Sequence, residues 1–343
     1  MQSFKRILKT VSIFLAVVIV LSIGFGALYF RGENYDYQDY RERDALAGKL
    51  TVLINGASYV MYGVDPEVLD HSLGVNSYNL TTSMLTLEGR YTLLAKELAR
   101  NPVHTVILEV SPDTVIRNRA EEVPEGDLHM LGKLGTAAER WAYFKDNFYL
   151  SEYPLAYYDA VSRGMESAFA LLTGRYQKEN TVARKGFYYT DNEKRPIPTD
   201  YRNIYHVHSF PDVSEIPEEN VKGLERLLDL CRENGATPIL ISIPNSKAYN
   251  CMYANLDDYD RWYQEFAASH DVKYVNFNRH KEKLTLLPDE TCFYDETHLN
   301  QEGAAVFSKM LSVVVRDIWN GKSYEWMFYK SLREPEYDPA FFH

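Results

Sequence analysis

The N-terminal segment limits what this chain can fold into more than any other feature. Residues 11–30 read VSIFLAVVIVLSIGFGALYF and contain no charged side chain. A helix of about 20 residues can cross the roughly 30 Å hydrocarbon core of a bilayer with its backbone groups bonded internally. Because the segment lacks a polar face, it is unsuited to a helix within a globular domain. We therefore expect a transmembrane helix over residues 11–30.

Basic residues before this segment predict its orientation. They are Lys5, Arg6 and Lys9. A positive flank stays on the cytoplasmic side, so residues 1–10 should be cytoplasmic and the rest should lie outside the cell membrane, held by a single-pass anchor. A cleaved signal peptide is the alternative, because Gly24 and Gly26 have the spacing of small residues at cleavage sites. The apolar stretch, however, exceeds the usual signal core of about 7–15 residues.

The charge and cysteine content exclude several classes of protein. The net charge is −11, whereas affinity for nucleic acid comes from clustered Lys and Arg. An acidic polymer would need a local basic patch. The three cysteines have neither a zinc nor a redox spacing, and no cofactor is indicated. Cys231 lies in a helical pattern, whereas Cys251 and Cys292 could pair if their Cα atoms came within about 7 Å.

The apolar pattern predicts the fold class. Residues 31–47 are polar and we interpret them as a stalk, whereas residues 48–320 alternate short apolar runs with amphipathic helical patterns. We expect strands at residues 50–54, 103–110, 238–243 and 273–277, and helices at 88–100, 219–234, 258–270 and 301–319. Asn55–Gly56 reads as a tight turn after the first strand, and Asn300 as the N-cap of the last helix. Such alternation predicts an α/β fold, a three-layer α/β/α sandwich with a mainly parallel sheet.

Two regions depart from this alternation. Residues 117–210 contain aromatic-rich helical stretches at about 133–149 and 152–174, followed by a loop rich in Lys, Arg and Pro. This insertion could form a lid over the active face, or it could be a helical subdomain without a role there. Residues 321–343 form an aromatic extension that either packs on the domain or contacts a membrane partner.

Ser58 is the candidate nucleophile. It follows the first strand and the turn Asn55-Gly56-Ala57, which places it at the carboxyl edge of the sheet, where ligands bind in open α/β folds. If the chain turns helical there, the Ser58 N–H would face an anion at a helix N-terminus. The motif differs from the Gly-x-Ser-x-Gly elbow of α/β-hydrolases. A serine that only caps a turn is the alternative.

Asp295 and His298 are the candidate partners of this serine. Their spacing, just before the last helix, lets a carboxylate and an imidazole meet, so that His298 can act as general base while Asp295 fixes its tautomer. A helix-capping loop with a surface histidine is the alternative. His206 and His208 share one face of an extended segment, which suits a metal, but a polar strand face is the simpler interpretation. We expect no metal site.

The order of these motifs resembles the SGNH (GDSL-like) hydrolase superfamily over residues 48–320. Phe293-Tyr-Asp295-Glu-Thr-His298-Leu-Asn-Gln-Glu-Gly303 matches its last block, and Gly56-Ala57-Ser58 stands where the family often has Gly-Asp-Ser. The resemblance implies a catalytic triad of Ser58, Asp295 and His298, and an oxyanion hole to which Gly56 belongs.

The two middle blocks of the family are less well matched. Asn79, in Tyr78-Asn79-Leu80, stands near the second block, and Ser111-Pro112-Asp113 replaces the third. The N–H or side chain of Asn79 is the best candidate for the remaining oxyanion donor. Asn245, after Ile243-Pro244, could line the cleft from the end of its strand, and a plain turn is the alternative.

A narrower resemblance suggests the reaction. The anchor, Gly-x-Ser followed by Tyr62-Gly63-Val64-Asp65-Pro66, and the final Asp-x-x-His look like the family of the D-alanyl transfer protein of teichoic acid D-alanylation. That family implies O-acyl transfer to a cell-wall or exported polymer, beside a multi-span membrane-bound O-acyltransferase. Hydrolysis of an ester by the same residues is one alternative. A non-catalytic cell-envelope assembly factor is the other.

Overall fold

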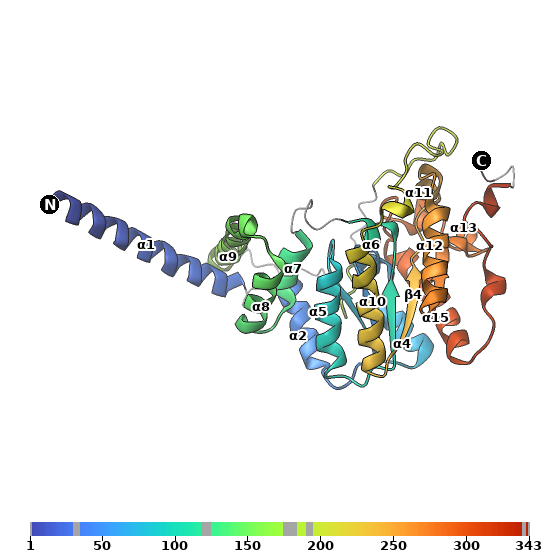
Figure 1. Cartoon of the computed structure of the whole chain (residues 1–343), viewed down its shortest axis with the longest axis horizontal. Coiled ribbons are helices and arrows are strands. Elements are labelled where there is room, and N and C mark those ends of the chain that lie inside the picture. The colour runs from blue at the N-terminus through green and yellow to red at the C-terminus, as the bar shows by residue number, and fades with distance from the viewer. Residues whose placement is uncertain are drawn as a thin grey trace. The chain divides into compact units, whose positions relative to one another are not determined.

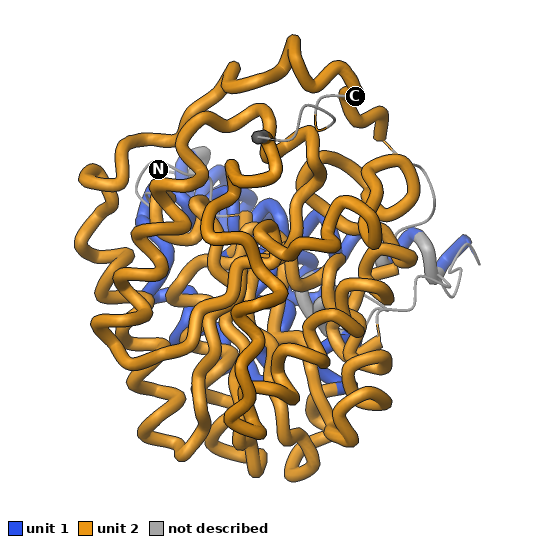
Figure 2. Tube along the Cα trace, turned by 90° about the vertical axis from the view of Figure 1, so that its right-hand side faces the viewer, with its two compact units in different colours: residues 1–42, 127–180 blue, residues 43–126, 181–343 orange. Residues whose placement is uncertain are grey.

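The computed structural model describes residues 2–29, 35–117, 125–173, 184–189, 195–337 and 341. The chain forms two compact units, which Figure 2 colours separately and which are described one at a time. Unit 1 comprises residues 1–42 and 127–180, and unit 2 comprises residues 43–126 and 181–343. The predicted insertion at 117–210 is therefore divided between the two units. Residue 30, residues 31–34 of the predicted stalk and much of the predicted basic loop lie outside the described residues.

Unit 2 is built on one sheet of five strands, in the order β2-β1-β3-β4-β5. The strands are β1 Val52–Gly56, β2 Ser77–Thr81, β3 Thr105–Glu109, β4 Thr237–Ser242 and β5 Lys273–Asn276. Every neighbouring pair is parallel. Nearly all residues of β1, β3 and β4 are buried, as expected for continuous apolar runs in a parallel sheet. The predicted α/β class with a parallel sheet is confirmed.

The start of this sheet differs from the prediction in two ways. β2 was not expected, because its sequence Ser-Tyr-Asn-Leu-Thr is mostly polar, yet all five residues are buried. Asn55 and Gly56 do not form a turn but complete β1, paired with Leu80 and Thr81. The Asn55 amide donates to the carbonyls of Leu80, at 3.3 Å, and Arg90, at 3.4 Å, whereas its buried Oδ1 has no hydrogen-bond partner among the described residues.

Two groups of helices pack with this sheet. Helices α5 Leu87–Leu98 and α10 Glu218–Glu233 contact each other and the strands, and Figure 1 shows them side by side. Helices α3 Ser58–Gly63, α4 Pro66–Leu73 and α15 Gln301–Trp319 form the second group, and α12 Leu256–Ser269 contacts β5. The shorter helices are α6 Pro112–Ile116, α11 Lys247–Met252, α13 Lys283–Leu286 and α14 Asp289–Cys292, with 3₁₀ turns at Val213–Glu215, Phe277–Arg279, Glu325–Met327 and Glu334–Tyr337.

The predicted helices agree with α5, α10, α12 and α15 to within two residues at each end. Asn300 caps α15 as expected, because its side chain accepts the Gly303 N–H at 2.9 Å. The hydrophobic core joins β1, β3, β4 and β5 to α15 through Ile54, Ile107, Ile241, Val275 and Phe307. Tyr324 belongs to this core and Phe328 packs against it, so the start of the C-terminal extension is part of unit 2. All three cysteines are buried and free, so Cys251 and Cys292 do not pair.

The predicted stalk is partly helical. Helix α2 covers Tyr35–Ala45, and near its end the side chain of Arg43 is fully buried against Glu97, with an Nη1–Oε1 distance of 2.7 Å. Arg100 donates to the same carboxylate at 2.8 Å. A buried charge is tolerated only where such partners satisfy it. Residues from Arg43 onward thus belong to unit 2, five residues earlier than the predicted boundary at 48.

Unit 1 contains the apolar helix and three helices from the insertion. Helix α1 covers Gln2–Tyr29, and residues Phe4–Phe25 within it are long and apolar enough to cross a membrane, with a hydropathy of 2.5. The others are α7 Glu125–Lys133, α8 Ala137–Asn147 and α9 Tyr153–Thr173, with a 3₁₀ turn at Leu150–Glu152. Helix α9 packs against α1.

Candidate active site

Ser58 lies at the carboxyl edge of the sheet because β1 ends two residues before it. Gly56 is the last residue of β1 and Ser58 is the first residue of α3. The carbonyl of the intervening Ala57 accepts the Thr81 hydroxyl at 2.6 Å, which ties this turn to the end of β2. The strand, turn and short helix together direct Ser58 out of the sheet at the edge where parallel α/β folds bind ligands.

Ser58, His298 and Asp295 form a continuous chain of hydrogen bonds. The His298 Nε2 lies 2.9 Å from the Ser58 Oγ, and the His298 Nδ1 lies 3.0 and 3.1 Å from the two carboxylate oxygens of Asp295. Ser58 is 240 residues from His298 in the chain. The structure thus brings together the three residues that the sequence motifs singled out.

The surroundings of Asp295 keep it ionised. Burial of this carboxyl favours its neutral form, but hydrogen bonds from His298 and from the backbone N–H groups of Thr297 and His298 outweigh burial and lower its pKa to about 2. An ionised carboxylate can only accept hydrogen bonds, so the Nδ1 of His298 must carry the proton. The Nε2 is then free to accept the proton of the Ser58 hydroxyl.

Tyrosine rings surround the imidazole of His298. The Tyr62 ring meets it edge-on at 5.1 Å between centroids, and the Tyr59 ring lies 5.6 Å away at a tilt. Tyr62 also stacks on Tyr294, at 6.5 Å, and meets Tyr188 edge-on. Burial, then the nearby Tyr188 and Tyr294, raise the pKa of Tyr62 to about 12, so this hydroxyl stays protonated at neutral pH. The tyrosine rings limit the orientations open to the His298 imidazole.

The predicted oxyanion role of Asn79 is wrong. Its backbone N–H donates to the carbonyl of Lys185 at 2.9 Å, and its side-chain amide donates to the carbonyl of Val64 at 2.7 Å. The residue is fully buried in β2, so neither donor is available to a substrate. By contrast, the backbone N–H of Ser58 donates to no group in the described part of the chain, so it is available to a ligand.

Gly56 is closely packed at the end of β1. A Cβ atom at this position would lie 2.7 Å from the Cβ of Glu109 and 2.4 Å from a methyl group of Val60, so only glycine fits. The carboxylate of Glu109 accepts the Ala57 N–H at 3.4 Å and pairs with Arg90 at 2.9 Å. The sequence analysis did not identify this buried ion pair beside Ala57. The one available signal was a charged residue at the end of an apolar strand.

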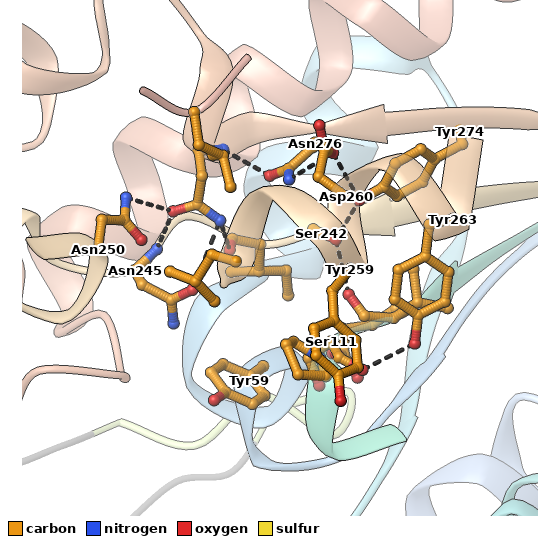
Figure 3. Close-up of a pocket in the computed structure, with 17 residues that line it drawn as sticks. Tyr59, Ser111, Ser242, Asn245, Asn250, Tyr259, Asp260, Tyr263, Tyr274 and Asn276 are labelled. Carbon is orange, nitrogen blue, oxygen red and sulfur yellow. Dashed lines mark hydrogen bonds between the residues drawn. The ribbon is translucent and has the colours of Figure 1, made fainter. Parts of the chain in front are cut away.

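A small cavity lies beyond Tyr59, at the carboxyl ends of β3, β4 and β5 (Figure 3). Its polar groups mostly bond to one another: the Tyr263 hydroxyl donates to the Ser111 carbonyl at 2.7 Å, and the Asn276 amide donates to Asp260 at 2.8 Å. Asn245 lines this cavity. Its amide reaches the Thr297 carbonyl at 3.4 Å, so Asn245 supports the loop that carries His298.

His206 and His208 each lie against an aromatic ring. His206 stacks on Tyr205, with ring centroids 3.8 Å apart, and His208 lies against Tyr253. Within the described residues no group of three or more His, Cys, Asp and Glu side chains could hold a metal ion.

No protein-family model matches the chain, and no curated protein matches its sequence. The geometry of the site therefore has to support any assignment of function.

Proposed function

We propose that this chain is a membrane-anchored serine acyl-transfer enzyme with an SGNH-like, three-layer α/β/α catalytic domain. The hydrogen-bonded series from Asp295 through His298 to Ser58 carries this proposal, with its 2.9 Å contact at the nucleophile. Hydrogen-bond reach between a nucleophile and a base that a third group orients is the geometric signature of covalent serine catalysis. Position in the fold supports it too, since Ser58 stands at the carboxyl edge of β1.

The reaction would proceed in two steps, acylation of Ser58 and transfer of the acyl group to the acceptor. His298 Nε2 takes the Ser58 proton while Oγ attacks the carbonyl carbon of an acyl ester, and the Ser58 N–H stabilises the oxyanion. The donor alcohol leaves with the proton from His298, and the acyl group remains on Ser58. A hydroxyl of the acceptor then gives its proton to His298 and attacks the acyl carbon. His298 passes this proton to the Ser58 Oγ as the bond between Oγ and the acyl carbon breaks, which releases the acylated acceptor and restores the Ser58 hydroxyl.

The anchor favours transfer to a polymer over hydrolysis of soluble esters. We propose that Lys5, Arg6 and Lys9 keep the N-terminus in the cytoplasm, so that Ser58 works outside the membrane. A tethered enzyme meets a membrane-presented donor or acceptor at a high effective concentration. The proposed acceptor is a hydroxyl of a cell-envelope polymer, with a multi-span membrane-bound O-acyltransferase as supplier of acyl groups.

Labelling by a fluorophosphonate tests the proposed nucleophile. The full-length protein in detergent should react covalently at Ser58, because the phosphonate captures the activated hydroxyl. Ser58→Ala and His298→Ala should abolish labelling, and Asp295→Asn should slow it by several orders of magnitude, on the order of 10⁴. Ser83→Ala should label like the unmodified protein, because Ser83 is a nearby, partly exposed serine without a histidine partner among the described residues. Labelling that survives Ser58→Ala would exclude the proposed mechanism.

Product analysis then separates transfer from hydrolysis. With small activated esters alone we expect slow release of acid, because water can resolve the acyl-enzyme when no acceptor is present. Added polymer should divert the acyl group from water to the polymer. Fast hydrolysis of soluble acylated sugars, unchanged by polymer, would identify an esterase instead. A protein that neither labels nor turns over would be the assembly factor considered above.

A further inference from the structure

Helix α9 in unit 1 has three distinct faces. Ala156, Ala160, Gly164 and Ala168 recur every four residues and form a face of small side chains. Asp159 and Arg163 form an ion pair, at 2.9 Å, on a second face. The third face is apolar and exposed, and its members are Tyr158, Met165, Phe169 and Leu172, which are between 52 and 86% exposed.

The small face packs closely on α1. A Cβ atom at Gly164 would lie 2.0 Å from the carbonyl oxygen of Phe25, so the two backbones touch at this point. The hydroxyl of Tyr157 bonds to that of Ser22. Close approach through small residues is the usual way in which helices associate where lipid replaces water.

This contact involves only the last part of the apolar helix. Between residues 4 and 25 of α1, the side chains that are not exposed are Val18, Ser22 and Phe25. They lie toward the C-terminal end of the candidate membrane span Phe4–Phe25. With the N-terminus in the cytoplasm, this end of α1 lies at the outer surface of the bilayer. The contact with α1 therefore holds helix α9 near the outer surface of the bilayer.

The two helices cross rather than run together. In Figure 1, α1 lies across the view whereas α9 is seen nearly end-on. A helix that crosses a membrane span at its outer end lies along the bilayer surface. Further exposed apolar side chains are Trp141 on α8, Tyr149 and Leu150 in the turn that follows it, and Leu155 in the first turn of α9. Tryptophan and tyrosine are enriched where a membrane meets water.

We propose that α9 is an interfacial helix, which inserts its Tyr158–Leu172 face into the outer leaflet beside the anchor. Continuity with α1 identifies the occupant of this face as lipid, because acyl chains that surround the outer end of α1 also reach the side chains beside it. The apolar area should drive the insertion, as for other helices that lie in a membrane surface. Charge contributes little, since the exposed Lys145 is followed by the exposed Asp146. The inference rests on the membrane-spanning role of α1 in the proposed function.

Fluorescent labels on the full-length protein in phosphatidylcholine vesicles test this inference. The native cysteines are buried, so a cysteine introduced by Phe169→Cys can be labelled selectively. A nitroxide high on the lipid acyl chain should quench this label, and aqueous iodide should not. Ile13→Cys, within α1, should be quenched by a nitroxide deep in the bilayer. Val313→Cys on α15 and Arg163→Cys on the charged face of α9 are the matched controls, and iodide should reach both.

The outcomes separate this inference from the anchor itself. If the Ile13 label is quenched by lipid but iodide reaches the Phe169 label, α1 spans the membrane and α9 does not touch it. If lipid reaches neither label, both assignments fail. If neither lipid nor iodide reaches the Phe169 label, protein covers the face and the inference is wrong. In the Met165→Cys protein, the further change Leu172→Glu should weaken insertion, so that iodide quenches the label at residue 165. If iodide quenching did not increase, this result would also contradict the insertion.

Discussion

His298 is held by a carboxylate on one side and by tyrosine rings on the other. Asp295 fixes the proton on Nδ1, and Tyr62 meets the ring edge-on at 5.1 Å. Neither group touches the acyl carbon in the proposed mechanism. Both act by keeping Nε2 directed at Ser58, so their loss should affect turnover more than binding.

Replacement of Tyr62 tests this positioning role. Tyr62→Phe retains the ring and should keep nearly full activity on small esters. Tyr62→Ala removes the ring and should lower kcat by about 10- to 100-fold with little change in KM, because small displacements of a catalytic group are costly. Steady-state kinetics of both variants would measure this split. If Tyr62→Phe were as impaired as Tyr62→Ala, the hydroxyl and not the ring would be the important group.

The ionised state of Asp295 predicts a pH dependence of stability. Its pKa is about 2 in the folded chain against an ordinary value of 3.8, which corresponds to about 2 kcal/mol of stability. Because the folded pKa is the lower one, this stability is fully present above about pH 4 and is lost as the pH falls toward 2. Urea unfolding of the unmodified protein and of Asp295→Asn should therefore converge over this interval. A difference that stays constant down to about pH 2.5 would contradict the assignment.

The proximity of Ser58 to His298 and Asp295 was predictable, because the order of the motifs along the chain implied it. A serine after the first strand and Asp-x-x-His before the last helix can meet, because both positions lie at the carboxyl edge of one parallel sheet. The role of Asn79 was not predictable, since its donors are used by Lys185 and Val64, which are distant in sequence. The ion pair of Arg90 and Glu109 was missed for the same reason.

Among the elements, edge strand β2 depends on a short segment from elsewhere in the chain. Lys185 and Gly186 lie against it, and the carbonyl of Lys185 accepts the Asn79 N–H. Gly186 has a φ of +74°, and a Cβ atom there would lie 2.1 Å from the carbonyl oxygen of Asn79. An uncovered edge strand invites pairing with other chains, so this segment protects the sheet.

Alanine substitutions can separate the contact at Gly186 from its backbone conformation. Gly186→Ala should destabilise unit 2 by about 2–4 kcal/mol, from a left-handed φ and from overpacking against the strand. Gly74→Ala is the matched control, because Gly74 has a φ of +70° but nothing within 4 Å of an added Cβ. It should cost only about 1 kcal/mol. If denaturant unfolding showed that Gly186→Ala and Gly74→Ala lower the free energy of unfolding equally, the segment around Gly186 would be able to move away from β2 without loss of stability.

The accuracy of the predicted elements follows from their composition. Strands β1, β3 and β4 are apolar runs, and helices α10 and α15 bury one regular face, so local pattern was sufficient. β2 escaped notice because tertiary contacts bury polar side chains such as Ser77 and Asn79. The helical part of the predicted stalk could not be anticipated either, since Arg43 is buried by Glu97, which is 54 residues away.

At the scale of the whole molecule, the basic flank of α1 predicts its topology. Protease added to intact cells should degrade the chain after residue 30, whereas an epitope tag before Met1 should survive until the membrane is permeabilised. Immunoblotting against the tag and against residues 321–343 would follow both ends. Complete protection of the C-terminal end in intact cells, with cleavage after permeabilisation, would place Ser58 in the cytoplasm and contradict the proposed acceptor.

The buried Arg43 also limits the length of chain between the end of α1 and the start of unit 2. Unit 2 begins at this residue, while α1 ends at Tyr29. Residues 30–34 can span at most about 18 Å even if fully extended, and the eight residues of α2 before Arg43 add about 12 Å as helix. With α1 in the bilayer, the point where the chain enters unit 2 stays within roughly 30 Å of the membrane surface. In the proposed function, Ser58 would act only on acceptors that lie within this distance plus the width of unit 2 from the membrane.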